Sequence, residues 1–228
     1  MRSILLFCVL MFTCLPILGQ EYNKYDSEGK RHGKWRKKYD NSDQIRYEGT
    51  FDHGKEIGSF KFYKPSSGDS PTAVKTFSKN SDTVKVKYFT QKGKVISQGQ
   101  MIGKERIGLW EYYHNSSKKI MMTEHYLSGK LDGEQRTYFE SGQLTESTSY
   151  VNGKRQGKRL IYSEKGIVIK EFIYENDQLH GITKYYNTNG DLIIEGNYKR
   201  DRKDGIWSYY TDGKLSEQKL FPVQNKGF

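Results

Sequence analysis

The sequence predicts an all-β fold: a single elongated, twisted antiparallel sheet built from about eight tandem β-hairpin repeats. Three observations predict it. Glycines recur every 24 to 25 residues, aromatic residues recur at fixed distances from them, and the chain is rich in Tyr (18) and Gly (23) but has only four Pro. Aromatic residues favour strands, and glycines favour the turns between them. A period of 24 residues leaves no room for a crossover helix, so neighbouring strands must be antiparallel.

Residues 1–19 are predicted to be a cleaved signal peptide. Arg2 supplies a positive start, residues 4–18 are mostly apolar, and the small residue Gly19 precedes the expected cut. This pattern is typical of a secretory signal. A transmembrane anchor is the alternative, but the apolar stretch is short and Pro16 interrupts its end. We therefore expect the chain to be exported to the periplasm or out of the cell.

The rest of the chain divides into three parts. Residues 20–27 are assigned to an N-terminal linker, residues 28–221 to the repeat array and residues 222–228 to a C-terminal tail. Both cysteines, Cys8 and Cys14, precede the expected cleavage site. An exported chain would have no disulfide or thiolate chemistry, and packing and strand pairing alone must stabilise it.

The array is predicted to contain eight units of 24–25 residues, each opened by a glycine. These glycines are Gly33, Gly58, Gly108, Gly133, Gly157, Gly181 and Gly205. The interval after Gly58 is doubled, which predicts a degenerate third unit with Thr83 in the glycine position. All three tryptophans, Trp35, Trp110 and Trp207, stand two residues after a glycine. Such internal periodicity is the signature of a repeat architecture.

Each unit is predicted to be one hairpin, and the last unit illustrates the elements. Residues 205–210 alternate as an aromatic strand, residues 211–214 contain the Asp-Gly pair of a tight turn, and residues 215–221 form the return strand. Units are joined by turns such as 152–157, whose glycines supply positive φ. Because side chains alternate between faces, the residues two and four positions after the glycine share one face.

The segments 152–157 (Asn-Gly-Lys-x-x-Gly) and 108–113 (Gly-Leu-Trp-Glu-Tyr-Tyr) resemble the MORN repeat. The turn and acidic return strand at 212–217 resemble the longer bacterial MORN variant. The resemblance spans roughly residues 28–221 and implies a binding or scaffolding module. Some bacterial members are named as antitoxins paired with secreted deaminase-like toxins, and eukaryotic members are associated with scaffolding and phospholipids. The chain departs from the pattern in its third unit and in an inserted loop, residues 64–72.

No pattern of an enzyme, a metal site or a cofactor site stands out. The Gly-Lys-x-x-Gly turns lack the Ser/Thr and the helix of a phosphate-binding loop. Glutamates that recur with the repeat period predict cross-strand pairing with lysines rather than a catalytic acid and base. The histidines show no metal-ligand spacing; they are His32, His53, His114, His125 and His180. We therefore predict a non-enzymatic protein with no catalytic residue, no metal and no cofactor.

The first candidate interaction surface is aromatic. A single sheet cannot bury both of its faces, and aromatic residues are enriched at protein interfaces. The residues chosen for this surface are Trp110, Tyr112, Trp207 and Tyr209. The alternative is that these aromatic side chains only pack against each other.

The second candidate is a basic rim along one long edge of the sheet. The formal net charge of +11 invites an anionic partner. The rim residues are Lys30, Arg31, Lys55, Lys104, Lys130, Lys154, Arg200 and Lys203. The alternative is that these cations only protect turns and strand edges against aggregation. Export argues against nucleic acid as the ordinary partner.

The leading functional prediction is a protein-interaction or scaffolding module of the cell envelope, with a toxin among the candidate partners, as in an antitoxin or immunity protein. The alternative is a basic scaffold bound to an anionic lipid or lipopolysaccharide surface. An enzyme acting on envelope polymers is a minor alternative. Neither end of the array shows an evident cap in the sequence, so an exposed terminal strand could pair end to end with a second chain.

Overall fold

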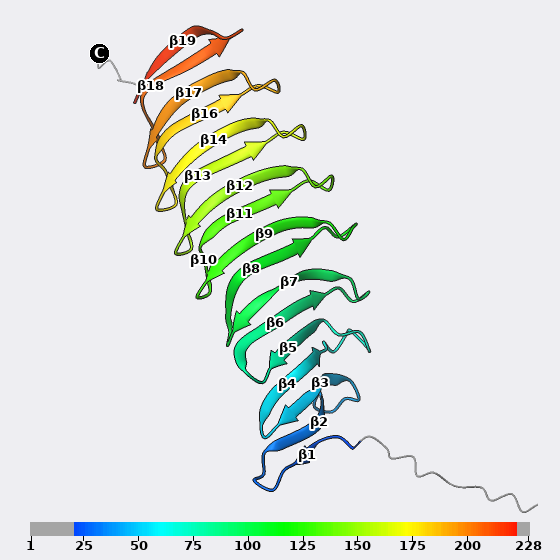
Figure 1. Cartoon of the computed structure of the whole chain (residues 1–228). Coiled ribbons are helices and arrows are strands. Elements are labelled where there is room, and N and C mark those ends of the chain that lie inside the picture. Colours follow the sequence, from blue (N-terminus) through cyan, green and yellow to red (C-terminus); the bar gives the residue numbers. More distant parts are fainter. Residues whose placement is uncertain (1–20, 223–228) are drawn as a thin grey trace, which may run out of the picture.

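The computed structural model describes residues 21–222, which form one open antiparallel sheet of 19 strands. Consecutive strands pair in chain order, so the sheet lengthens steadily from the N-terminal to the C-terminal end (Figure 1). The predicted fold class is confirmed. The predicted signal peptide and residues 223–228 of the predicted tail lie outside the described residues.

Eight long hairpins make up the sheet. Hairpin 1 is β2 (Arg31–Lys38) with β3 (Ile45–Asp52), hairpin 2 is β4 (Lys55–Phe62) with β5 (Ala73–Ser78), and hairpin 3 is β6 (Ser81–Phe89) with β7 (Val95–Ile102). Hairpin 4 is β8 (Glu105–Tyr113) with β9 (Ile120–Leu127), hairpin 5 is β10 (Lys130–Leu131) and β11 (Gly133–Tyr138) with β12 (Leu144–Val151), and hairpin 6 is β13 (Lys154–Tyr162) with β14 (Val168–Glu175). Hairpin 7 is β15 (Gln178–Leu179) and β16 (Gly181–Tyr186) with β17 (Leu192–Lys199), and hairpin 8 is β18 (Arg202–Thr211) with β19 (Lys214–Phe221). A two-residue strand, β1 (Lys24–Tyr25), precedes them.

The connections alternate between the two long edges of the sheet (Figure 1). Turns inside a hairpin lie along one edge, and turns between hairpins lie along the other, which we call the inter-hairpin edge. Its turns are tight because two consecutive residues adopt positive φ, as at His53 (47°) and Gly54 (85°) or Asn152 (50°) and Gly153 (84°). This is the geometry of a type I′ turn, whose twist matches that of the flanking strands.

Each strand-opening glycine faces an aromatic residue on the return strand of its own hairpin. Gly33 pairs with Phe51, for example, and Gly108 pairs with Tyr126. Gly33 and Gly108 both have positive φ, 76° and 61°. A side chain would be strained in this conformation, which explains why glycine recurs there.

The third unit has a different register from the one predicted. Val84, not Thr83, holds the glycine position, because Val84 pairs with Met101 as each glycine pairs with its aromatic residue. Tyr88 therefore corresponds to Tyr112 rather than to the tyrosine that follows it. The prediction was wrong by one residue because the loop between β4 and β5 shifts the strand that follows.

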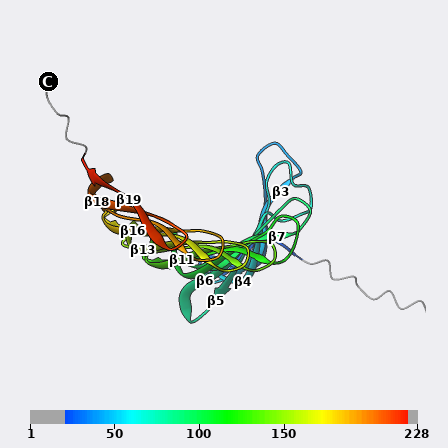
Figure 2. The ribbon, with the colours of Figure 1, turned by 90° about the horizontal axis from the view of Figure 1, so that it is seen from above.

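The sheet is curved rather than flat when viewed from above (Figure 2), as the right-handed twist of strands requires. One of its faces, the aromatic face, carries the indoles and most of the buried rings. At the N-terminal end Trp35, Phe51 and Phe60 form a buried cluster, and their rings meet edge to face at centroid distances of 5.7 Å and 5.1 Å. Tyr47, Phe62 and Phe77 pack around this cluster.

Residues 22–26, which sequence reasoning assigned to a linker, cover the outer edge of β2. The indole Nε1 of Trp35 donates to the carbonyl oxygen of Lys24 at 3.0 Å, and the Tyr25 ring meets the indole edge to face at 5.2 Å. The prediction that this end has no cap is therefore wrong. The chain folds back because the first indole would otherwise be exposed at the edge.

The C-terminal end differs from the N-terminal end. Within residues 21–222, no strand pairs with the outer edge of β19, and only Phe221 of its eight residues is not exposed. End-to-end pairing through this strand stays a prediction. No helix long and apolar enough to cross a membrane occurs in the described part of the chain.

Candidate functional site

Two of the four residues chosen for the aromatic surface are buried. Trp110 and Trp207 are 0% and 1% exposed. Each indole lies on a glycine of the preceding return strand: a Cβ added to Gly99 would lie 2.4 Å from the Trp110 ring, and one added to Gly196 would lie 2.2 Å from the Trp207 ring. The prediction that these tryptophans are accessible is wrong, because the neighbouring glycine lets the indole lie flat across the adjacent strand.

The indoles are also fixed by equivalent hydrogen bonds. The Nε1 of Trp110 donates to the carbonyl oxygen of Gln100, and that of Trp207 donates to the carbonyl oxygen of Asn197, both at 3.1 Å. Buried in this way, the two indoles hold adjacent hairpins together. A signal in the sequence could have shown this: Gly49, Gly99 and Gly196 each stand eleven residues before the aromatic residue that covers them, Phe60, Trp110 and Trp207.

The two tyrosines of the same prediction are half-buried. The Tyr112 hydroxyl donates to Glu124 Oε2 at 2.6 Å and accepts a hydrogen bond from Arg106 at 2.6 Å. Burial, followed by the Glu124 carboxylate, raises the pKa of Tyr112 well above its ordinary value. Tyr209 has Lys219 Nζ 5.2 Å from its ring centroid. Both side chains are therefore held by neighbouring side chains of the sheet.

The centre of the aromatic face is polar instead of aromatic. Glu124, a residue that is 6% exposed, also accepts a hydrogen bond from Gln135 Nε2 at 2.8 Å. Between hairpins 5 and 6, Arg159 donates two hydrogen bonds to Glu146 at 2.9 Å and 3.0 Å. The hydroxyl of Thr148, 2% exposed, donates to Glu146 Oε1 at 3.0 Å. This network was not predicted, although the sequence carries a signal for it: the position two residues after the glycine holds Gln135 and Arg159 in these units, where other units have an aromatic residue.

The recurring glutamates do not occupy one equivalent position. Glu124, Glu146 and Glu217 lie on the aromatic face, whereas Glu48, Glu171 and Glu195 lie on the opposite face, as their strand partners show. These glutamates stand two, three or four residues before the recurring aromatic residue of their own strand, and because side chains alternate between faces, those at an odd offset lie on the opposite face. Most of these glutamates still pair with cations of a neighbouring strand, as Glu171 does with Lys158 at 2.9 Å.

The predicted basic residues lie at the inter-hairpin edge or beside it. Arg31 is positioned over the Trp35 and Phe51 rings at 5.4 Å and 4.9 Å, and Lys203 lies 4.0 Å from the Trp207 ring centroid. These two cations therefore cover the buried aromatic residues. Lys30 forms an ion pair with Glu28. The remaining rim residues are exposed and form no ion pair within residues 21–222; they are Lys55, Lys104, Lys130, Lys154 and Arg200.

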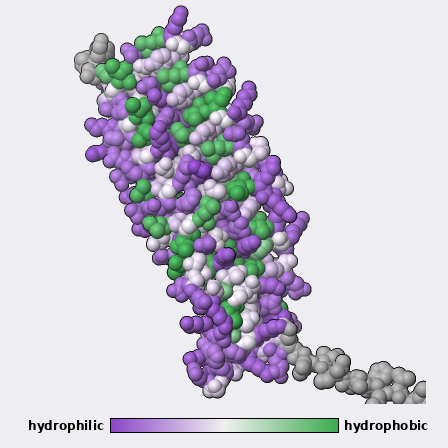
Figure 3. Space-filling model, viewed as in Figure 1, coloured by the Kyte–Doolittle hydropathy of each residue, from purple (hydrophilic) through white to green (hydrophobic). Residues whose placement is uncertain are grey.

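Carboxylates are interleaved with these cations. Asp132 accepts a hydrogen bond from the backbone N–H of Asn152 at 3.0 Å, and Asp201 accepts one from that of Leu179 at 2.8 Å. Each of these acids ties one inter-hairpin turn to a neighbouring turn. The edge therefore carries mixed charge, and Figure 3 shows hydrophilic residues along both long edges of the sheet.

The opposite face exposes aliphatic side chains in the last two hairpins. Ile182, Ile206 and Leu220 are 52%, 59% and 60% exposed. Ile206 pairs directly with Leu220, and Ile182 pairs with Asn197 on the intervening strand. We call these three residues the aliphatic patch. Sequence reasoning missed it, although its signal is present: the residue after the strand-opening glycine is aliphatic in these units and charged in others, such as Lys34 and Lys158.

The model of the MORN repeat variant matches residues 131–152 and 179–200. These two segments of the chain are therefore repeats of the MORN variant type. Each matched MORN segment consists of most of one hairpin, hairpin 5 or hairpin 7, and part of the turn after it. MORN repeats are non-catalytic modules that bind proteins or membranes.

Among solved structures, this MORN-repeat chain is similar over part of its length to the following three. They are a mutant of S. aureus TarM in complex with fondaparinux, alpha-GlcNAc-glycerol and UDP (16% identity, TM-score 0.33, 43% of this chain and 19% of that chain), TarM (16%, 0.33, 44% and 19%) and a GtfA/B complex (17%, 0.29, 40% and 18%). The chain thus covers less than a fifth of each of these proteins. No curated protein matches the chain.

Proposed function

We propose that the chain is a non-enzymatic protein-interaction module of the cell envelope, and that a partner protein packs against the aliphatic patch. The observation that carries the proposal is the exposure of Ile182, Ile206 and Leu220 on one face of the last two hairpins. Exposed apolar side chains that gather on one surface are typical of interaction sites. Burying them against a partner releases about 25 cal/mol per Å² of apolar surface.

The surroundings of the patch favour a protein over an anionic surface. Its polar neighbours on the same face include the uncharged Asn197, Ser208 and Gln218, and Gln218 Nε2 donates to the Ser208 hydroxyl at 3.1 Å. The residues paired with Asn197 and Ser208 are acidic, Asp204 and Glu195, and their charge would repel an anionic surface. The open edge of β19 lies directly beside the patch and could extend the contact through backbone hydrogen bonds.

Capture from an envelope extract under crosslinking, with quantification by mass spectrometry, tests the proposal. Ile206→Glu should reduce recovery of the specific partner at least tenfold. Leu109→Glu is the matched control, because Leu109 holds the same repeat position in hairpin 4 and is also exposed. Equal recovery with both variants, or no specific partner for the native chain, would overturn the proposal.

Export from the cytoplasm is part of the proposal and rests on the sequence of residues 1–19. The protein recovered from the periplasm or medium should begin at Gln20 when its N-terminus is sequenced. A chain found only in the cytoplasm and starting at Met1 would contradict this. The narrower form of the proposal is an immunity role with a secreted toxin as partner. It predicts that co-expression of the chain rescues growth in the presence of that toxin and that Ile206→Glu abolishes rescue.

Binding to an anionic lipid surface is the second candidate, favoured by the exposed lysines of the inter-hairpin edge. Co-sedimentation with vesicles containing anionic phospholipid, over a series of salt concentrations, tests it. Replacing Lys104 and Lys130 with serine should weaken binding more than replacing Lys85 and Lys87, which also removes two positive charges. Binding that is absent at low salt, or that salt does not weaken, would exclude this candidate.

A further inference from the structure

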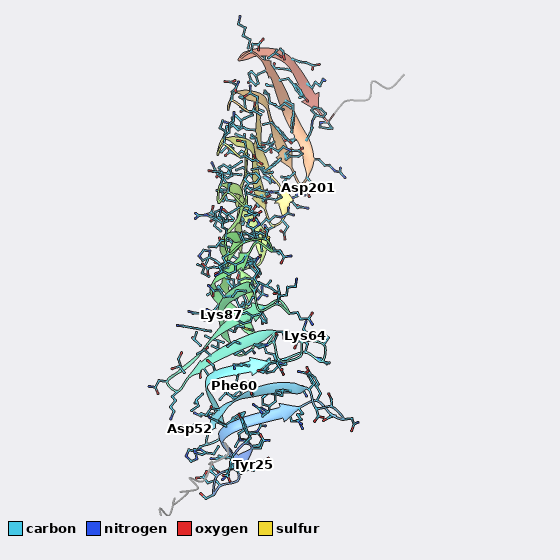
Figure 4. All side chains as sticks on the ribbon, turned by 90° about the vertical axis from the view of Figure 1, so that its right-hand side faces the viewer. Tyr25, Asp52, Phe60, Lys64, Lys87 and Asp201 are labelled. Atoms are coloured by element: carbon cyan, nitrogen blue, oxygen red, sulfur yellow. The ribbon has the colours of Figure 1, made fainter. Side chains whose placement is uncertain are left out.

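Three side chains with metal-binding groups meet at the N-terminal end of the sheet. Asp26 comes from the cap, His32 from β2 and His53 from the turn between β3 and β4, and their ligand atoms all lie within 4.8 Å of one another. Asp26 Oδ2 and His53 Nδ1 are 2.7 Å apart, and the two imidazole centroids are 4.9 Å apart. Figure 4 labels Asp52 and Tyr25 at this end of the molecule.

The fold fixes the backbone of each of these residues. Asp26 Oδ1 accepts hydrogen bonds from the backbone N–H groups of Glu28 and Lys30 at 2.9 Å and 2.8 Å, which leaves Oδ2 directed at His53. His53 is held at a φ of 47° in its turn. The next residue, Gly54, donates its backbone N–H to the carbonyl oxygen of Arg31 at 2.8 Å, which ties the turn to the strand that carries His32.

We propose that Asp26, His32 and His53 bind one divalent transition-metal ion of the zinc type. Two imidazoles and one carboxylate are a common ligand set for Zn²⁺, and they leave a fourth position for water. Donor atoms around a tetrahedral Zn²⁺ lie about 3.3 Å apart, given bond lengths near 2.0–2.1 Å. The histidine side chains are 48% and 63% exposed, so their χ angles can change to bring the imidazoles together.

One further feature supports this site. Asp52 Oδ1 lies 3.8 Å from His32 Nδ1, where a carboxylate can orient a metal-bound imidazole. The ion would take the place of the hydrogen bond between Asp26 and His53.

A bound ion would join three segments of the chain: the cap, β2 and the β3–β4 turn. Because the ion binds the folded cap and not the unfolded chain, it would stabilise this end of the array. This site lies at the opposite end of the sheet from the aliphatic patch, so the proposal is independent of the proposed partner.

Isothermal titration calorimetry with ZnCl₂, on the chain purified without a polyhistidine tag, tests the site. One Zn²⁺ per chain is expected. His32→Ala, His53→Ala and Asp26→Asn should each weaken binding about tenfold or more. Zn²⁺ should raise the midpoint of thermal unfolding of the native chain, followed by circular dichroism, and should not raise that of His53→Ala.

His180→Ala is the matched control. His180 also lies beside the inter-hairpin edge and is 3.6 Å from a carboxylate, Glu175, but it has no second imidazole beside it within the described residues. The control should bind Zn²⁺ like the native chain. The proposal is overturned if the native chain binds no Zn²⁺, if His180→Ala loses as much affinity as His53→Ala, or if the three site variants bind normally. Circular dichroism of each variant without metal separates loss of the site from loss of the fold.

Discussion

The tryptophan hairpins and the central hairpins place different residues at the same position of the aromatic face. In hairpins 4 and 8 this position holds Trp110 and Trp207, each lying on a glycine of the preceding strand. In hairpins 5 and 6 it holds Gln135 and Arg159, and the neighbouring positions of the preceding strands hold Glu124 and Thr148. The backbone pairing is the same, but packing of large rings is exchanged for hydrogen bonds.

The comparison teaches that two adjacent positions share one volume. A glycine on one strand leaves room for an indole on the next, whereas a larger residue on the first strand accompanies a smaller or polar residue on the second. Hairpin 3 fits this rule, because Val86 holds the indole position where Lys75 stands on the preceding strand. Interiors are close-packed, so the two positions must change together.

The largest expected effect is that of removing an indole. Trp110→Ala should destabilise the chain by about 3–5 kcal/mol, because it deletes a fully buried aromatic residue. Gln135→Ala at the equivalent central position should cost only about 1–2 kcal/mol, since it removes one hydrogen bond to Glu124. Urea denaturation followed by circular dichroism measures both, and equal losses would refute the contrast between the two regions.

The shared volume can be tested by filling it. Gly99→Ala should cost about 1–3 kcal/mol, because its Cβ would overlap the Trp110 ring. Gly99 does not adopt positive φ, so backbone strain does not contribute. In a chain that already carries Trp110→Val, Gly99→Ala should cost less, because the smaller side chain leaves room for the added Cβ. A double-mutant cycle measures the coupling energy between Gly99 and Trp110. Strictly additive changes in the free energy of unfolding would show that the two positions are independent.

The central network should be weaker than the aromatic packing. Arg159→Met removes both hydrogen bonds to Glu146 and should cost about 1–2 kcal/mol, because the two side chains are only partly buried. Arg36→Met is a matched control on the opposite face, where Arg36 also donates two hydrogen bonds to a carboxylate, Glu48. If Arg159→Met lowered the free energy of unfolding as much as Trp110→Ala does, the central network would not be weaker than the aromatic packing.

The smallest effect concerns pH at the inter-hairpin edge. The backbone N–H of Arg155, followed by its guanidinium, holds the pKa of Asp177 below its ordinary value of 3.8. A lowered pKa means that this contact stabilises the fold above about pH 3.8 and is lost as the pH falls through the folded pKa. Amide hydrogen exchange of the turn should therefore accelerate at low pH. Asp177→Asn should remove this pH dependence while Asp132→Asn, in another turn, leaves it unchanged.

Much of the fold could be predicted because its determinants are local. Glycines at positive φ, two-residue turns and the alternation of side chains along a strand act within one hairpin. The register predicted for hairpin 3 was wrong by one residue, because the loop between β4 and β5 lengthens hairpin 2. The binding residues could not be predicted as well. The burial of Trp110 depends on Gly99 of another hairpin. Ile206 is exposed because no other strand of the described residues covers its face of the sheet.

The sequence by itself determined that this protein is an open array of antiparallel hairpins, because each repeat carries its own turn and strand signals. Only the tertiary structure decided which residues that array buries, exposes and brings together. Strand pairing placed the indoles on glycines and left the aliphatic patch uncovered. It also joined Asp26, His32 and His53, which lie in three separate segments with no ligand spacing along the chain. Contacts between segments depend on register and on loop lengths, which accumulate along the array and cannot be read from one repeat.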